Sequence, residues 1–96
     1  MKKYKTFEDL EFKRHPNRFL EGTQAVIFFP NNYGASVVCG KDFYSNGVDT
    51  YEIACLYKGE NEGPLVYPKD TPFENGVCGY CSKERITNLM KEIQDF

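Results

Sequence analysis

The chain has 96 residues, a formal net charge of −2, and 41% apolar and 16% aromatic residues, the aromatic ones being only Phe and Tyr. This composition excludes a disordered chain and predicts a single domain over residues 1–96, with room for one small core. No apolar run approaches the ~18 residues of a membrane-spanning helix, and the weak net charge disfavours a nucleic-acid partner.

Charge is unevenly distributed, because the first twenty residues hold six basic and three acidic side chains. These basic residues are too few for the clustered Lys and Arg of a nucleic-acid-binding face. The start of the chain is basic but is not followed by the apolar stretch of a signal peptide. We therefore expect a cytoplasmic protein with four reduced cysteines and with neither nucleic acid nor membrane as a partner.

The segment before the first long strand is predicted to be mostly irregular. Thr6 is a suitable cap for a short turn over Phe7–Leu10, with acidic residues at its start. Lys13–Gly22 is predicted to be a loop with a short extended piece, since Pro16 disfavours helical backbone at the residue before it.

The most apolar and β-branched part of the chain predicts a β-hairpin. Gln24–Phe29 is apolar on both faces, as in a strand that is covered on both sides. Pro30–Gly34 supplies Pro, Asn and Gly, the residues that tight turns require, and Ala35–Cys39 is the returning strand. We expect the rest of the sheet to be built on this hairpin.

After the hairpin, the pattern alternates between loops and strands. Lys41–Asp49 is a polar loop with an Asn-Gly turn signal, and Thr50–Tyr57 alternates as a third strand. Leu65–Tyr67 is predicted to be a short fourth strand, followed by an irregular segment over Pro68–Gly76.

The last element is an amphipathic helix over about Lys83–Gln94, with Ser82 as its N-cap. Its apolar residues recur at helical spacing, and they are Ile86, Leu89, Met90 and Ile93. The predicted fold class is therefore α+β: an antiparallel meander of four or five strands, with the C-terminal helix across one face.

Cys78-Gly79-Tyr80-Cys81 is the sharpest chemical motif. A C-x-x-C at the start of a helix is typical of dithiol redox sites, because the helix N-terminus stabilises a thiolate. In the thioredoxin fold, however, most of the sheet follows this motif, and here only fifteen residues follow Cys81. This context disfavours a dithiol redox enzyme.

Zinc is the second interpretation of the cysteines. The four candidate ligands are Cys39, Cys55, Cys78 and Cys81. Zinc ligands usually come as two close pairs, and this chain has one, while Cys39 and Cys55 lie within strand patterns. The simplest interpretation is four unconnected thiols and no cofactor, with a zinc or dithiol site as the alternative.

No catalytic constellation is evident in the sequence. His15 is the only histidine, and it has no acid or nucleophile beside it. The chain has no nucleophile elbow, phosphate-binding loop or dinucleotide fingerprint. A small hydrolase would require His15 to meet a loop carboxylate, and nothing in the sequence indicates this, so we predict a protein without catalytic residues.

Aromatic residues at the predicted loop tips favour binding instead. Tyrosines at such positions give rigid amphipathic contact area at low entropic cost. Packing of these rings over the open face of the sheet is the alternative. The predicted binding residues are Asn31, Asn32, Tyr33, Phe43 and Tyr44, with a homo-oligomeric partner as a candidate to complete the surface.

Several segments together resemble a group of small uncharacterised proteins of bacteriophages, prophages and bacterial genomes. The segments are Phe7–Phe12, Gln24-Ala25, Phe28–Gly34 with Ser36–Val38 and Gly40, Tyr51-Glu52 and Gly79-Tyr80. The central motif reads F-P-N-[GN]-Y-G-x-S-V-V, and where such proteins typically have glycine this chain has Asn32, which also tolerates left-handed backbone.

The resemblance implies a phage-associated accessory protein of the host cytoplasm, without an established activity. Proteins of this kind often bind a host factor or sequester a small molecule in counter-defence. It also implies that cysteine is not a fixed feature at Cys78 and Cys81. From the sequence we therefore expect a non-catalytic binding protein, with a host protein or a small molecule as its partner.

Overall fold

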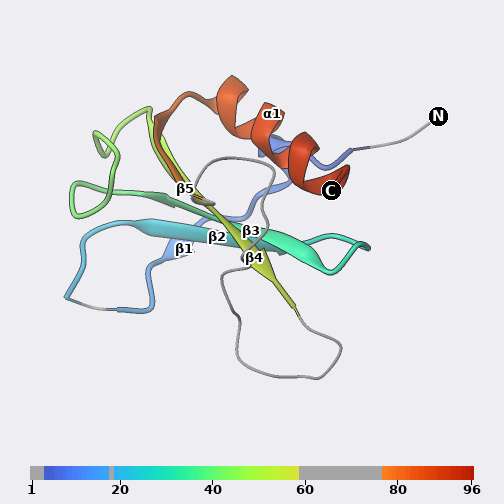
Figure 1. The fold of residues 1–96 in the computed structure, drawn as a ribbon. Helices are drawn as coiled ribbons and strands as arrows, with labels where there is room; N and C mark the ends of the chain where they lie inside the picture. The colour runs from blue at the N-terminus through green and yellow to red at the C-terminus, as the bar shows by residue number, and fades with distance from the viewer. Residues whose placement is uncertain (1–3, 18, 59–76) are drawn as a thin grey trace.

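The computed structural model describes residues 4–17, 19–58 and 77–96 (Figure 1). The elements in chain order are the 3-10 turn η1 (Phe7–Asp9), the strands β1 (Lys13–Arg14), β2 (Thr23–Phe28), β3 (Tyr33–Cys39), β4 (Tyr51–Tyr57) and β5 (Val77–Cys81), and the helix α1 (Lys83–Gln94).

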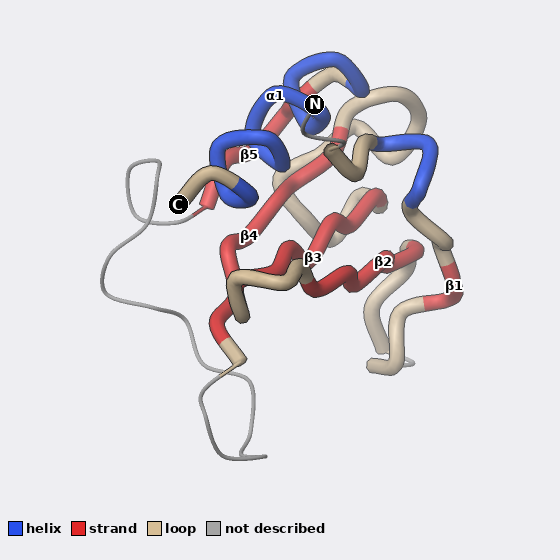
Figure 2. The backbone as a smooth tube through the Cα atoms, turned by 90° about the vertical axis from the view of Figure 1, so that its right-hand side faces the viewer, coloured by secondary structure: helices blue, strands red, loops and turns tan. Residues whose placement is uncertain are grey.

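The five strands form one antiparallel sheet in the order β1-β2-β3-β4-β5, so that each strand pairs with the next along the chain. Helix α1 lies across one face of this sheet, where it contacts β3, β4 and β5 (Figure 2). The predicted α+β meander with a C-terminal helix is confirmed.

The predicted strand Leu65–Tyr67 and the segment Pro68–Gly76 lie outside the described residues. Within the described ranges, no helix has the length and apolar character needed to span a membrane.

The hairpin of β2 and β3 forms in the predicted place but has a shorter turn. The amide N–H of Phe29 donates to the carbonyl of Tyr33 at 2.8 Å, and that of Asn32 donates to Phe29 at 3.0 Å. Tyr33 and Gly34, predicted to lie in the turn, are therefore the first residues of β3, paired with Tyr57 and Leu56 of β4. The turn closes through Asn32, whose φ of 69° lies in the left-handed region that asparagine tolerates.

The core lies between α1 and the sheet. Strand residues at alternate positions point towards α1, because side chains of a strand alternate between faces. Ser82 is the N-cap of the helix, and its Oγ accepts the Arg85 N–H at 3.1 Å. The helix buries the four residues of the predicted stripe completely. Each of these side chains stabilises the fold by about 1.5–3 kcal/mol. The largest fully buried residues are Ile53, Ile86, Leu89, Met90, Ile93, Val37 and Cys55.

The N-terminal segment runs along α1. Turn η1 forms at the predicted position, and its first amide N–H, of Phe7, donates to the Thr87 hydroxyl of α1 at 3.1 Å. The ring of Phe7 packs edge-on against Tyr51 of β4 at 5.0 Å between centroids. Tyr4 donates from its hydroxyl to the Asp95 carboxylate at 2.8 Å. Phe7, Leu10 and Phe12 of this segment thus pack against the core.

Strand β5 differs from the prediction, in which Cys78–Cys81 is a motif at the start of the helix and not part of a strand. It contains a bulge: Tyr51 pairs with Cys81, whereas Ile53 pairs with Cys78. Two residues of β5, Gly79 and Tyr80, therefore lie opposite one residue of β4, Glu52. Tyr80 takes a φ of 53°, which is left-handed backbone.

Candidate functional site

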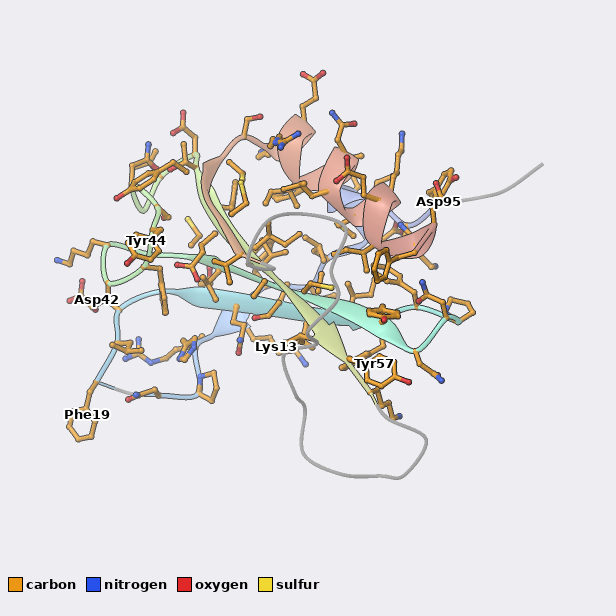
Figure 3. All side chains as sticks on the ribbon, in the orientation of Figure 1. Lys13, Phe19, Asp42, Tyr44, Tyr57 and Asp95 are labelled. Carbon is orange, nitrogen blue, oxygen red and sulfur yellow. The ribbon has the colours of Figure 1, made fainter. Side chains whose placement is uncertain are left out.

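The structure separates the five predicted binding residues into two groups at opposite ends of β3. Asn31, Asn32 and Tyr33 lie at the end where β3 begins, and Tyr33 pairs with Tyr57. The loop with Phe43 and Tyr44 follows the other end. Figure 3 shows the labelled Tyr44 and Tyr57 on opposite sides of the molecule. The two groups are therefore separated by the length of β3, and a binding role for either group remains a prediction.

Asn31 is used to fix the end of α1. Its side-chain amide donates to the carbonyl oxygens of Ile93 at 2.8 Å and Gln94 at 3.4 Å. Its Oδ1 accepts the amide N–H of Tyr33 at 3.1 Å. The last carbonyls of a helix have no partner within the helix, so Asn31 supplies a donor that they need. This side chain has a structural task in the fold.

Tyr33 and Asn32 also contact their own chain. The ring of Tyr33 lies 4.9 Å from that of Tyr57 and 5.1 Å from that of Phe96, measured between centroids. The carbonyl of Asn32 accepts the Lys58 N–H at 2.8 Å. Tyr33 is thus half-buried beside α1 and is not an exposed turn residue, and a binding role for these three residues remains a prediction.

The loop over residues 40–49 is held by two of its own side chains. Ser45 is buried, and its Oγ accepts the amide N–H groups of Gly40 at 3.0 Å and Gly47 at 2.9 Å. The Oδ1 of Asn46 accepts three further amide N–H groups, from residues 48, 49 and 50. The loop therefore has one defined conformation, which positions Phe43 and Tyr44.

Phe43 packs inward, against His15. The two rings lie 5.1 Å apart, and Nδ1 of His15 accepts the Asn17 N–H at 3.1 Å. Gly22 lies directly behind, since a Cβ there would come within 2.8 Å of the Phe43 ring. His15 thus serves as a packing partner of Phe43 and anchors the N-terminal loop to the loop over residues 40–49.

Tyr44 faces solvent, and 64% of it is exposed. Tyr80 in the β5 bulge is equally exposed, and the two ring centroids lie 6.4 Å apart. The two tyrosines line an open hollow of about 380 Å³, which we call the tyrosine hollow. Among the described residues, its lining is Lys41, Asp42, Phe43, Tyr44, Glu52 and Tyr80.

The β5 bulge builds the tyrosine hollow by docking on the loop. The amide N–H of Tyr80 donates to the carbonyl of Tyr44 at 2.9 Å. Gly79 permits this approach, because a Cβ there would lie 2.6 Å from the Cβ of Tyr44, which is closer than carbon atoms pack. The bulge thus brings two exposed rings together from segments 36 residues apart in the sequence.

The charged lining of the tyrosine hollow is mostly acidic. Oε1 of Glu52 accepts the Tyr44 N–H at 2.9 Å, and its Oε2 has no partner among the described residues. Lys41 pairs with Glu21, outside the lining, at 2.8 Å, and this contact raises the pKa of the lysine. Asp42 accepts the Glu21 N–H at 2.7 Å. Glu52 and Asp42 thus each keep one carboxylate oxygen without a hydrogen bond among the described residues, and both line the tyrosine hollow.

Of the four cysteines, the structure brings only Cys78 and Cys81 into contact, with their sulfur atoms 3.2 Å apart. Burial, together with the contact to Cys78, raises the pKa of the Cys81 thiol to about 12. Burial also raises the pKa of the Cys55 thiol to about 11. Cys39 lies beside the Ser45 hydroxyl at 3.9 Å. In the described parts of the chain, no three His, Cys, Asp or Glu side chains are grouped to hold a metal ion.

Comparison with known proteins gives no match among protein-family models, curated proteins or solved structures. Four lining residues of the tyrosine hollow were not predicted as binding residues: Lys41 and Asp42, which precede the predicted Phe43, and Glu52 and Tyr80, which come from β4 and β5. Glu52 could have been noticed in the sequence, because it is a charged residue on a strand face whose other residues, Ala54 and Leu56, are apolar. Tyr80 carried no such signal, because its position depends on the bulge.

Proposed function

We propose that the protein is a non-catalytic binding protein, and that its tyrosine hollow binds a basic side chain of a partner protein. The observation that carries this proposal is the conformation of Tyr80, an exposed aromatic residue with a φ of 53°.

Left-handed backbone costs a residue with a side chain about 1–2 kcal/mol, and glycine or asparagine avoids most of this cost. Tyr80 recovers little of it by burial, since 64% of the residue remains exposed. Strained positions persist where the side chain serves another purpose, and such positions cluster at binding sites. The Tyr80 side chain therefore suits recognition better than stability.

The chemistry of the lining favours a cation. Glu52 offers one free carboxylate oxygen, and the rings of Tyr44 and Tyr80 line the same hollow. Guanidinium and ammonium groups bind carboxylates by charge-assisted hydrogen bonds and stack on aromatic faces. Arginine combines both contacts in one planar group, so we propose an arginine side chain as the preferred ligand.

The resemblance to bacteriophage and prophage proteins makes a host protein the partner that we propose, with a role in counter-defence. A hollow of about 380 Å³ accepts one long side chain, so the surrounding loop surface would supply the remaining contacts. No cofactor is needed for this activity.

The test is affinity capture from bacterial extracts with the wild-type protein and the variant Tyr80→Gly. Glycine suits the backbone at this position, so the variant should fold with unchanged or slightly higher stability. Phe19→Ser is the matched control, since Phe19 is an exposed aromatic residue and Figure 3 shows it away from Tyr44.

We expect the wild type and Phe19→Ser to capture the same partner in equal amounts. Tyr80→Gly should capture roughly one tenth of that amount or less, as is usual when a binding hot spot is removed. Equal capture by Tyr80→Gly would exclude the tyrosine hollow as the binding site. Capture of the chain itself in place of a host protein would replace the proposed host partner with a homo-oligomer.

A further inference from the structure

We propose that Cys78 and Cys81 are a reversible dithiol–disulfide site, whose reaction partners are small-molecule disulfides such as oxidised glutathione. This proposal is independent of the binding function proposed above and rests on the geometry of strand β5.

The two sulfur atoms are already in contact. The Cys81 thiol donates to Cys78 Sγ across 3.2 Å. A disulfide bond is about 2.0 Å long, so the sulfur atoms need to approach by only about 1 Å. Cys81 is also followed directly by Ser82, the N-cap of α1, which fixes the backbone on one side of the pair.

The β5 bulge is what brings the thiols together. In a regular strand, residues three apart point to opposite faces and their Cα atoms lie about 10 Å apart. Here the extra residue places Cys78 opposite Ile53 and Cys81 opposite Tyr51, which lie on the same face of β4. The left-handed backbone of Tyr80 thus permits the thiol contact.

The two thiols differ in access. Cys78 is half-buried and reachable, whereas Cys81 is 3% exposed. Burial and the neighbouring Cys78 hold the pKa of Cys81 at about 12, which keeps it protonated until its neighbour has reacted. This order assigns Cys78 as the attacking thiol and Cys81 as the resolving thiol.

The reaction balances with one molecule of disulfide, RSSR. The Cys78 thiolate attacks one sulfur of RSSR, which gives a Cys78–SR mixed disulfide and releases RS⁻. Cys81 then loses its proton and attacks Cys78 Sγ, which releases the second RS⁻. Both thiolates take up the protons given by the two cysteines, so the protein dithiol is oxidised and RSSR is reduced to two RSH.

The sequence allows a clean measurement, because trypsin separates the cysteines into three peptides. Residues 70–83 hold both Cys78 and Cys81, residues 19–41 hold Cys39, and residues 42–58 hold Cys55. Reduced full-length protein is incubated with oxidised glutathione, then quenched with N-ethylmaleimide, digested and analysed by mass spectrometry.

We expect peptide 70–83 to lose the mass of two hydrogen atoms, while Cys39 and Cys55 carry N-ethylmaleimide. The disulfide should form roughly tenfold or more faster in the folded protein than in urea, because the fold holds the two sulfur atoms together. Dithiothreitol should restore the dithiol.

The single variants test the order of attack. Cys81→Ser should accumulate glutathione on Cys78, whereas Cys78→Ser should leave Cys81 unmodified because it is buried. Cys39→Ser, at the other partly exposed cysteine, is the control and should leave the disulfide unchanged. A peptide 70–83 that stays reduced in the folded protein, or that forms the disulfide no faster than in urea, would overturn the proposal.

Discussion

At the scale of single residues, Tyr80 connects the two proposals. Its left-handed backbone produces the bulge that places Cys78 against Cys81, and its side chain forms one wall of the tyrosine hollow. The two consequences can be separated experimentally, because glycine keeps the backbone and removes the ring. Tyr80→Gly should therefore lose binding and still form the disulfide.

Cys55 gives a residue-scale prediction about pH. Burial raises the pKa of its thiol from 9.0 to about 11, so the folded protein favours the neutral thiol. The stabilisation is complete below about pH 9, where both states are neutral, and is lost as the pH rises through about 11. Between about pH 8 and about pH 10.5, ionisation of this thiol in the unfolded state should lower the free energy of unfolding by about 2 kcal/mol.

The measurement is urea unfolding of the wild type and Cys55→Ala at both pH values. Tyrosines and the other thiols titrate in both proteins, so the difference between the two pH dependences isolates Cys55. The wild type should lose more stability than the variant over this interval. Parallel losses in the two proteins would show that the Cys55 thiol ionises equally in the folded and unfolded states.

The residue-scale part of the site was only partly predictable. Tyr44 was correctly placed in a loop, because the surrounding residues are polar and contain an Asn-Gly turn. Glu52 and Tyr80 reach the same hollow through tertiary pairing, which leaves no local pattern. Asn31 was predicted as a turn residue, and its Oδ1 does accept the Tyr33 N–H, but its side-chain amide also donates to α1, 62 residues further along the chain.

At the scale of elements, α1 was predicted with its observed bounds because several local signals agree. Ser82 is a strong N-cap, and the apolar stripe has helical spacing. β5 had the opposite properties: Val-Cys-Gly-Tyr-Cys does not alternate and contains only one β-branched residue. β5 forms a strand because it pairs with the edge of β4 and packs against α1. Neither contact can be read from the local sequence.

Asn31 gives the element-scale prediction, because it connects the β2–β3 turn to the end of α1. Asn31→Asp keeps the acceptor for the Tyr33 N–H but removes the donor to Ile93 and Gln94. It also places a negative charge at the negative end of the helix. We expect the free energy of unfolding to fall by about 1–3 kcal/mol, measured by urea unfolding at neutral pH.

Asn32→Gly is the matched control, since it changes the neighbouring residue at a φ of 69° where glycine is at least as favourable. Its stability should equal or slightly exceed that of the wild type. An Asn31→Asp protein as stable as the Asn32→Gly protein would mean that the contact with the helix end contributes nothing.

At the scale of the whole molecule, the fold class followed from the sequence, but the grouping of site residues did not. The five predicted binding residues were close in sequence, yet β3 carries the chain from one end of the sheet to the other between Tyr33 and Phe43. At the far end, the loop over residues 40–49 and the β5 bulge meet, and only this tertiary contact creates the tyrosine hollow.

The central claim is that this hollow recognises a basic side chain. The most direct measurement is an amide proton–nitrogen NMR titration of the wild type, Glu52→Gln and Tyr80→Gly with millimolar N-acetyl-arginine methylamide, using the uncharged citrulline analogue as the control ligand. We predict shifts of the Tyr44 and Tyr80 amides with the arginine compound only, reduced in Glu52→Gln and absent from Tyr44 in Tyr80→Gly. Equal shifts with both compounds, or shifts that persist unchanged in the two variants, would contradict the claim.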